Sequence, residues 1–294
     1  MLRVKPRGIS IVDQAGLQGR LWTPLLLRPA LWLDADDLST ISTATGVSEW
    51  RDKGPNARNV TQGTGGTQPT LTPNGLNGRN VLSFNGSQYL TSPAATSVWN
   101  FLHNTNGSSV FAVWKAGNVS NPDTIYGLLG NSAAATGNIG YSLFLDDRSS
   151  VPRNEKIIGQ VVRGASGTSA LVNISADLAH PPNVPTILSN IGDPNNGTAA
   201  NRSVIRVNRG AAIQLNASTD APSASNASFA LQIGTVGNNA FPLVGYIAEI
   251  VVLASIASAA VRQQIEGYLA WKWGLRNGLI AGHPFANRPP LIGD

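Results

Sequence analysis

The chain has 294 residues, of which 42% are hydrophobic and only 13% are charged, and its formal net charge is +5. The absence of cysteine excludes disulfide bonds and cysteine-ligated zinc sites. No apolar run reaches the ~18 residues of a membrane span, and no apolar segment follows the basic start of the chain, so we expect neither membrane insertion nor a secretory leader.

Most of the excess positive charge lies in the first 28 residues. They carry five basic side chains and one acidic side chain, whereas the rest of the chain is nearly neutral. We predict that residues 1–28 form an extended arm that docks on an acidic protein partner. The residues assigned to this contact are Arg3, Lys5, Arg7, Arg20, Trp22 and Arg28. Two alternatives stay open: a strand laid on the chain's own domain and, less favoured because no compact Lys/Arg run is present, contact with nucleic acid.

An acidic cluster follows the first predicted strand of the main domain. The apolar residues 31–33 precede Asp34, Asp36 and Asp37. Carboxylates are calcium ligands, but this spacing lacks the glycine-anchored loop of an EF-hand. We therefore expect a solvated or capping cluster without metal or cofactor, and calcium binding is the alternative.

Turn-forming residues dominate the next stretch, residues 54–78, which we interpret as a long surface loop. The dipeptide Asn85-Gly86 then predicts a tight hairpin between residues 81–84 and 88–90, because Asn-Gly readily adopts the positive φ that such a turn requires. From residue 109 to residue 233, short β-branched and aromatic runs alternate with turn clusters. This pattern predicts an antiparallel β-sandwich.

Two different periodicities meet near the C-terminus. Residues 245–253 form an apolar, β-branched run around the single charge of Glu249, which predicts a strand covered on both faces. Helical spacing begins after Ser258, a good N-cap residue, and Gly274 is placed to end the helix. We therefore predict one C-terminal helix directly after a buried strand.

Several motifs resemble a known family. They are residues 29–37, 47–53 and 77–86 near the start of the domain, then residues 266–275 followed by His283-Pro284-Phe285. In this order they are similar to the signature of the concanavalin A-like, laminin-G-like jelly-roll proteins of tailed-phage virions. The resemblance implies one all-β domain, an antiparallel jelly-roll sandwich over residues 29–285 with one C-terminal helix. The arm at residues 1–28 would precede it, and a tail at residues 286–294 would follow.

The motifs of common hydrolases are missing. Jelly-roll glucanases carry carboxylates at alternating positions of one strand, as in Glu-x-Asp-x-x-Glu, whereas Glu249 stands alone among apolar neighbours. No serine lies in a Gly-x-Ser-x-Gly motif, and the three histidines lack zinc-ligand spacing. We therefore expect that the protein is not an enzyme, with polysaccharide hydrolysis as a remote alternative.

Carbohydrate binding is the chemistry that remains. A sugar site in such a sandwich combines an aromatic platform with amide, guanidinium and carboxylate groups in loops, because a sugar has an apolar face and a ring of hydroxyls. The candidate glycan-binding residues are Trp99, Tyr126, Tyr141, Asp146, Asp147 and Arg148. The alternative for each aromatic residue is a place in the core or in a contact between subunits.

Together these observations predict a structural protein of a tailed-phage virion, either a capsid decoration or a surface component of the tail or baseplate. It would dock through residues 1–28 and display a lectin-like domain. The alternative is a glycan-binding adhesin that attaches the particle to its host. The expected partners are other virion proteins, further copies of the chain and, for the adhesin, a cell-surface glycan. The expected location is the virion, after synthesis in the host cytoplasm.

Overall fold

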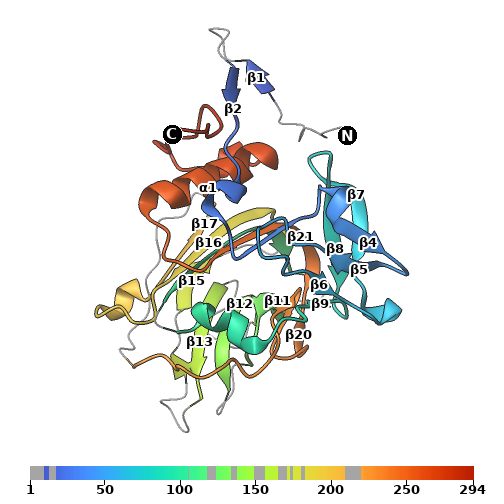
Figure 1. The fold of residues 1–294 in the computed structure, drawn as a ribbon, viewed down its shortest axis with the longest axis vertical. Coiled ribbons are helices and arrows are strands. Elements are labelled where there is room, and N and C mark those ends of the chain that lie inside the picture. Colours follow the sequence, from blue (N-terminus) through green and yellow to red (C-terminus); the bar gives the residue numbers. More distant parts are fainter. Residues whose placement is uncertain are drawn as a thin grey trace.

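A computed structural model describes residues 10–12, 18–104, 106–117, 124–133, 138–148, 156–164, 171–172, 175–179, 183–208 and 220–294. Two antiparallel sheets face each other, and the helix α1 (Ala259–Lys272) covers the outer face of one of them (Figure 1). This architecture confirms the predicted all-β antiparallel sandwich with a single C-terminal α-helix in the described part of the chain.

The sheet beneath α1, here called the helix-side sheet, is formed by strands from both ends of the chain. In the described residues its order is β17 (Ser203–Val207), β16 (Thr186–Gly192), β10 (Ser108–Ala116), β21 (Val244–Leu253), β8 (Arg79–Asn85) and β7 (Thr70–Leu76), and β3 (Leu31–Asp34) also pairs with β21. The central place of β21 brings the C-terminal part of the chain between strands from its first half.

The opposite sheet, here called the second sheet, is built from shorter strands. In the described residues its order is β14 (Leu171–Val172), β13 (Lys156–Arg163), β12 (Ile139–Asp146), β11 (Ile125–Gly130), β18 (Gln232–Ile233), β9 (Leu90–Thr91), β6 (Val60–Thr61), β5 (Val47–Trp50) and β4 (Ile41–Thr43), and β15 (Ser175–Ala179) pairs with β13.

Short elements complete the described fold. Two small hairpins are formed by β1 (Ser10–Val12) with β2 (Gln18–Arg20) and by β19 (Thr235–Val236) with β20 (Phe241–Pro242). The 3₁₀ helices are η1 (Pro24–Leu27), η2 (Leu38–Thr40), η3 (Gly65–Thr67), η4 (Thr96–Leu102), η6 (Ala199–Asn201) and η7 (Arg276–Gly278).

The strand β21 is buried on both faces, as its continuous apolar run predicts. Ile247 and Ile250 belong to the apolar core between the two sheets. Ala248 and Val251 belong to a second apolar cluster, between the helix-side sheet and α1. The sandwich is therefore three layers deep at this strand: second sheet, helix-side sheet and helix.

The ends of α1 follow the sequence signals. The Ser258 hydroxyl accepts a hydrogen bond from the backbone N–H of Val261 at 3.3 Å, so it caps the first turn. Gly274 has a φ of +68°, the left-handed conformation that commonly ends a helix. The predicted strand and helix near the C-terminus are both confirmed.

The predicted hairpin at Asn85-Gly86 is wrong. β8 ends at Asn85 in the helix-side sheet, and the next strand, β9, lies in the second sheet, so the chain crosses between sheets here. The two-residue turn instead lies at Asn77-Gly78, where both φ values are positive and β7 pairs with β8. The interpretation of residues 54–78 as one long loop is also wrong, because β6 and β7 lie within this range.

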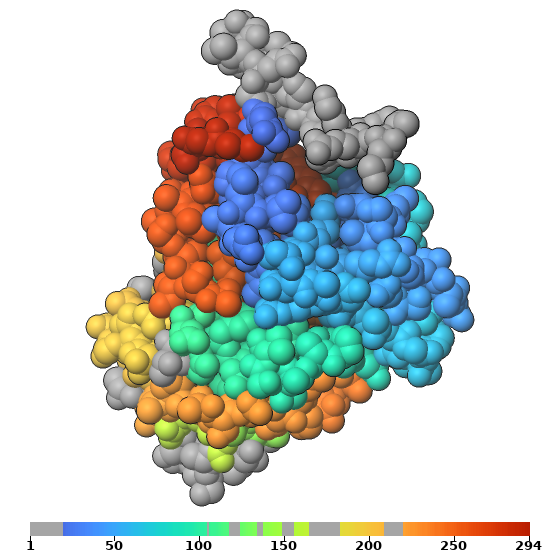
Figure 2. All heavy atoms as spheres, viewed as in Figure 1, coloured from blue at the N-terminus to red at the C-terminus, as the bar shows by residue number. Residues whose placement is uncertain are grey.

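Residues 20–28 lie on the domain. Leu21 forms a β-bridge with Leu291, and the backbone N–H of Trp22 donates to the carbonyl of Pro290 at 3.0 Å. Trp22 is buried against Tyr268, with ring centroids 6.0 Å apart. Figure 2 shows the blue N-terminal segment against the red C-terminal one. Trp22 therefore belongs to the core and does not present its ring to a partner.

The remaining residues assigned to docking differ in position. Arg20 and Arg28 are exposed. Arg3, Lys5 and Arg7 lie outside the described residues.

Candidate functional site

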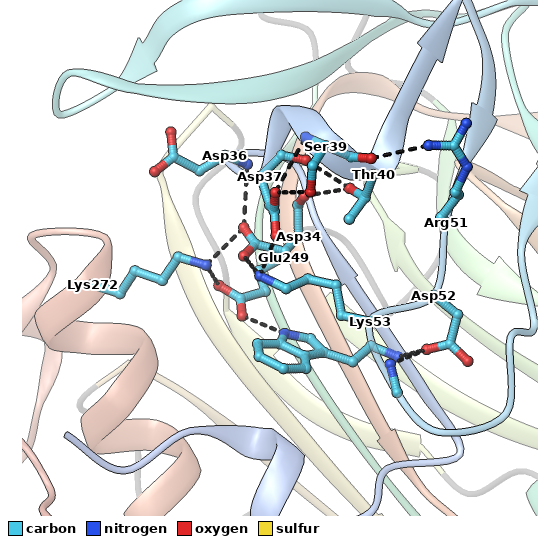
Figure 3. Close-up of polar contacts among 12 residues, drawn as sticks. Asp34, Asp36, Asp37, Ser39, Thr40, Arg51, Asp52, Lys53, Glu249 and Lys272 are labelled. Atoms are coloured by element: carbon cyan, nitrogen blue, oxygen red, sulfur yellow. Dashed lines mark hydrogen bonds and ion pairs between the residues drawn. The ribbon is translucent and has the colours of Figure 1, made fainter. Parts of the chain in front are cut away.

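A buried charged cluster joins α1 to the helix-side sheet (Figure 3). Its centre is Glu249, whose carboxylate is completely buried. Oε1 accepts hydrogen bonds from Trp32 Nε1 at 2.7 Å and from Tyr268 Oη at 2.9 Å. Oε2 accepts hydrogen bonds from Trp273 Nε1 and Lys272 Nζ, both at 2.7 Å. The lone charge that the sequence placed in an apolar strand is thus held by four donors.

Asp34 lies beside Glu249, because the two residues face each other across the pair of strands β3 and β21. Its Oδ1 is 2.7 Å from Lys272 Nζ, and its Oδ2 is 2.7 Å from Lys53 Nζ. Lys53 also stacks over the Trp32 ring, 4.5 Å from its centroid. Two carboxylates and two ammonium groups therefore balance one another between sheet and helix. We call Asp34, Lys53, Glu249 and Lys272 the Glu249 cluster.

The pKa values of the two carboxyl groups in this cluster are shifted in opposite directions. Burial raises the pKa of Glu249, and the attraction of Lys272 does not cancel this effect. Burial also acts to raise the pKa of Asp34, but the attraction of Lys272 and Lys53 outweighs it, so the pKa ends below its ordinary value. The negative charge is thus held most firmly on Asp34.

The contacts of Asp34, Asp36 and Asp37 show what role this acidic cluster has in the structure. Asp36 pairs with Arg79. Asp37 accepts hydrogen bonds from the backbone and side chain of Ser39 and caps η2. The cluster therefore acts by capping and ion pairing, and its carboxylates are already occupied by cationic groups. In the residues that the structure describes, no group of three or more His, Asp or Glu side chains is placed to hold a metal ion.

The aromatic residues expected to bind sugar lie in the core. Trp99 is 0% exposed, Tyr126 is 1% exposed and Tyr141 is 2% exposed. The Tyr141 hydroxyl donates to Asn190 Oδ1 at 2.6 Å, inside the sandwich. None of these rings offers a face on which a sugar could stack, because all three are packed in the hydrophobic core of the sandwich.

The polar candidates follow the same pattern. The carboxylate of Asp146 is fully buried and forms a two-pronged ion pair with Arg148, with Nε–Oδ1 and Nη2–Oδ2 distances of 2.8 Å. Asp147 is also buried. Only the Arg148 side chain reaches solvent, at 39% exposure. The structure therefore brings Asp146 and Arg148 together at the end of β12, but not with the three aromatic residues as one open site.

A groove lies at the C-terminal end of α1. Its volume is about 520 Å³, and its lining residues are Leu76, Asn77, Pro185, Asn208, Gly274, Leu275, Asn277 and Gly278. They come from the turn between β7 and β8, the start of β16, the end of β17, and the segment from α1 to η7. We call this feature the asparagine groove, because three of its lining residues are asparagines and none is charged.

Two of these asparagines are fixed by the backbone around them. Asn77 Nδ2 donates to the carbonyl of Trp273 at 2.7 Å, and Asn208 Oδ1 accepts from the backbone N–H of Ile187 at 2.8 Å. Both residues have left-handed φ values, +49° and +46°, which asparagine tolerates well. Among the described residues no hydrogen bond uses Asn77 Oδ1 or Asn208 Nδ2, so one acceptor and one donor are fixed in position without a partner from these residues.

Sequence reasoning missed this groove. The Asn-Gly pair at residues 77 and 78 was a visible turn signal, but nothing along the chain indicates that Asn208 and Asn277 lie beside it. Within the described residues, no helix has the length and apolar character needed to cross a membrane.

No family model matches the sequence, and no curated protein matches it. Among solved structures, the chain resembles Trypanosoma rangeli sialidase in complex with sialic acid, with a TM-score of 0.54 and 12% identity over 90% of this chain and 36% of that chain. The same sialidase in complex with 2,3-difluorosialic acid gives a TM-score of 0.52 and 12% identity, over 92% of this chain and 36% of that one. The CBM40 of Ruminococcus gnavus IT-sialidase, bound to alpha2,3 sialyllactose, gives a TM-score of only 0.39 and 13% identity, over 53% of this chain and 80% of that chain.

The comparison corrects the expectation that the protein is not an enzyme. The fold that covers 90% of this chain occurs in a sialidase, which is an enzyme, although the chain spans only 36% of that protein's length. The expectation depended on motifs within single strands, and a folded site can instead gather its groups from separate segments. At 12% identity, the likeness establishes a shared β-sandwich fold.

Proposed function

We propose that this protein is a glycan-binding β-sandwich module that attaches a tailed-phage particle to carbohydrate on its host cell. The observation that carries the proposal is the asparagine groove, which combines fixed amide groups with apolar lining residues. The likeness to sialidases contributes the fold and not the identity of the sugar. The resemblance of the sequence motifs to virion proteins supports the phage assignment.

The lining of the groove favours an uncharged sugar. Amides both donate and accept hydrogen bonds, as sugar hydroxyls require, and Leu76, Leu275 and Pro185 can cover the apolar face of a pyranose ring. An acidic sugar would need a cationic partner, and none of the lining residues is charged. We therefore expect neutral hexose-containing glycans to bind in preference to sialylated ones.

A glycan array with the full-length protein tests this assignment, together with a variant that fills the groove. A Cβ atom at Gly278 would lie in ordinary contact with Asn208, 3.4 Å from its Oδ1, so Gly278→Phe places a ring in the groove without a backbone clash. We expect this variant to weaken binding at least about tenfold, the effect of losing one to two hydrogen bonds.

The matched control is Gly66→Phe, which adds the same ring on another 3₁₀ helix, η3, where a Cβ atom meets nothing within 4 Å. This control should bind like the unaltered protein. Equal binding by both variants would place the glycan elsewhere, and the absence of binding to any glycan or to host cells would remove the proposal.

A second role, fixation in the virion, is favoured by the distribution of charge and of exposed apolar residues. The excess positive charge lies in residues 1–28, and Leu25 and Leu26 on η1 are 50% and 53% exposed next to the exposed Arg28. An acidic, partly apolar surface of a neighbouring virion protein would complement this segment. The protein would then be present in several copies on the particle.

Charge reversal at Arg3, Lys5 and Arg7 to Glu tests this second role, because it leaves the described contacts of residues 20–28 unchanged. We expect the triple variant to fold normally by circular dichroism and to be depleted from purified particles by at least about tenfold, as three lost ion pairs at an interface would cause. Incorporation equal to that of the unaltered chain would contradict docking through these residues.

A further inference from the structure

Lys272 and Asp34 meet in a setting unlike that of an ordinary surface ion pair. Lys272 Nζ is 2.7 Å from Asp34 Oδ1 and also 2.7 Å from Glu249 Oε2. The Asp34 side chain is 4% exposed, that of Glu249 is 0% exposed and that of Lys272 is 15% exposed. The amine of Lys272 therefore contacts two carboxyl groups in a site that is largely shielded from solvent.

The surrounding structure holds these three groups in place. Asp34 and Glu249 are paired residues on adjacent strands, so their separation is set by the sheet. Lys272 is the last residue of α1, and its side chain extends from the helix toward both of them (Figure 3). The rings of Tyr268 and Trp273 lie beside its ammonium group, with centroids 5.6 and 5.1 Å from Nζ. Fixed orientation and exclusion of water both accelerate a reaction between neighbouring groups.

We propose that Lys272 and Asp34 become joined by an intramolecular isopeptide bond after folding, with Glu249 as the proton carrier. The Lys272 ammonium transfers a proton to the Glu249 carboxylate, Glu249 passes it to the Asp34 oxygen that faces Lys272, and the free amine then attacks Cγ of the neutral Asp34 carboxyl group. A new N–C bond forms, and one C–O bond of Asp34 breaks. The departing oxygen leaves as water with two of the ammonium protons, one of them delivered by Glu249. Glu249 ends as it began, and no oxidant or other reactant is needed.

Lys53 is placed to assist the attack. Its Nζ is 2.7 Å from Asp34 Oδ2, the oxygen that does not face Lys272. Negative charge that develops on this oxygen as the amine adds to Cγ is therefore stabilised by an ammonium group already in position. Burial raises the pKa of Glu249, which favours its protonated form and suits a group that must accept and return a proton.

The burial of the cluster also favours the product. A buried ion pair carries a desolvation cost that its own attraction offsets only in part, whereas an amide is neutral and needs only hydrogen-bond partners. After the reaction, Lys53 can donate to the remaining Asp34 oxygen. In water the reverse reaction, hydrolysis, would be favoured by solvation of the two charges, and here little water can reach the bond.

Intact-mass spectrometry of the purified full-length protein under denaturing conditions tests the proposal directly. We expect a mass lower than that of the sequence by one water molecule. A tryptic digest should contain one branched peptide that links Asp34 to Lys272, with no cleavage after Lys272. An unmodified protein at the full sequence mass would overturn the proposal without the need for any variant.

Three variants then assign the groups. Lys272→Arg and Glu249→Gln should both have the full mass, because the first lacks the attacking amine and the second lacks the proton carrier. Lys115→Arg is the control and should keep the loss of water, since Lys115 lies outside the Glu249 cluster and stacks over the Tyr246 ring, 5.2 Å from its centroid. A branched peptide that contains Lys53 in place of Lys272 would overturn the assignment of the amine. Loss of water that persists in Glu249→Gln would overturn the role of Glu249.

Discussion

Glu249 is the residue on which the contacts of α1 converge. Trp273 and Lys272 donate to its carboxylate from the end of the helix, and Tyr268 does the same from one turn earlier. The sequence identified Glu249 as a single charge in a buried strand, and a buried carboxylate must find donors. It could not identify those donors, because they come from β3 and α1, at opposite ends of the chain.

Trp273→Phe tests the strength of this attachment. The substitution removes the hydrogen bond from Nε1 to the Glu249 carboxylate, and hydrogen bonds to charged groups are worth about 1.5–3 kcal/mol. We expect a loss of about that size in the free energy of unfolding, measured by urea denaturation.

Trp271→Phe is the matched control for this measurement. Its Nε1 donates to a neutral acceptor, the carbonyl of Phe285, at 2.8 Å, and such a bond contributes about 1 kcal/mol. Trp271 also lies only partly buried, whereas Trp273 is completely buried. Equal losses in the two variants would mean that the contact with Glu249 adds nothing specific.

At the scale of the element, local signals located α1 correctly and misplaced the hairpin. A cap such as Ser258 acts within one turn of its own helix, so the sequence around it is sufficient to find it. An Asn-Gly pair shows where the chain can turn, but not which strand the chain joins afterwards. Asn77-Gly78 returns the chain to the same sheet, whereas after Asn85-Gly86 it passes to the other sheet.

Ser258→Ala tests the N-terminal cap of α1. The substitution removes the acceptor for the backbone N–H of Val261 and should lower the free energy of unfolding by about 1 kcal/mol. Ser255→Ala is a suitable control, because only the backbone carbonyl of Ser255 is engaged, by the Ser109 hydroxyl. A result in which Ser255→Ala destabilises the protein as much as Ser258→Ala would contradict the capping role.

At the scale of the whole molecule, the sequence predicts the sandwich but not the asparagine groove. The alternation of apolar and polar residues and the spacing of turns are repeated along the chain, so the prediction of the fold class stays correct even where single elements are misplaced. The groove exists only after residues 76–77, 185, 208, 274–275 and 277–278 have been brought together by the sheet order. The aromatic residues predicted to bind sugar did not indicate the position of a binding site. The packing of the two sheets decides which rings are buried, and the sequence does not show this packing.

The pairing of Leu21 with Leu291 has a consequence for how the molecule can be mounted. The N–H of Ile292 also donates to the carbonyl of Arg20, at 2.9 Å, so the two terminal segments leave the sandwich side by side. A partner protein that binds either segment therefore attaches to the same end of the domain, the end at which Leu21 pairs with Leu291. Binding of the second segment to the same partner would add avidity without changing the orientation of the domain. The opposite end of the domain would remain exposed.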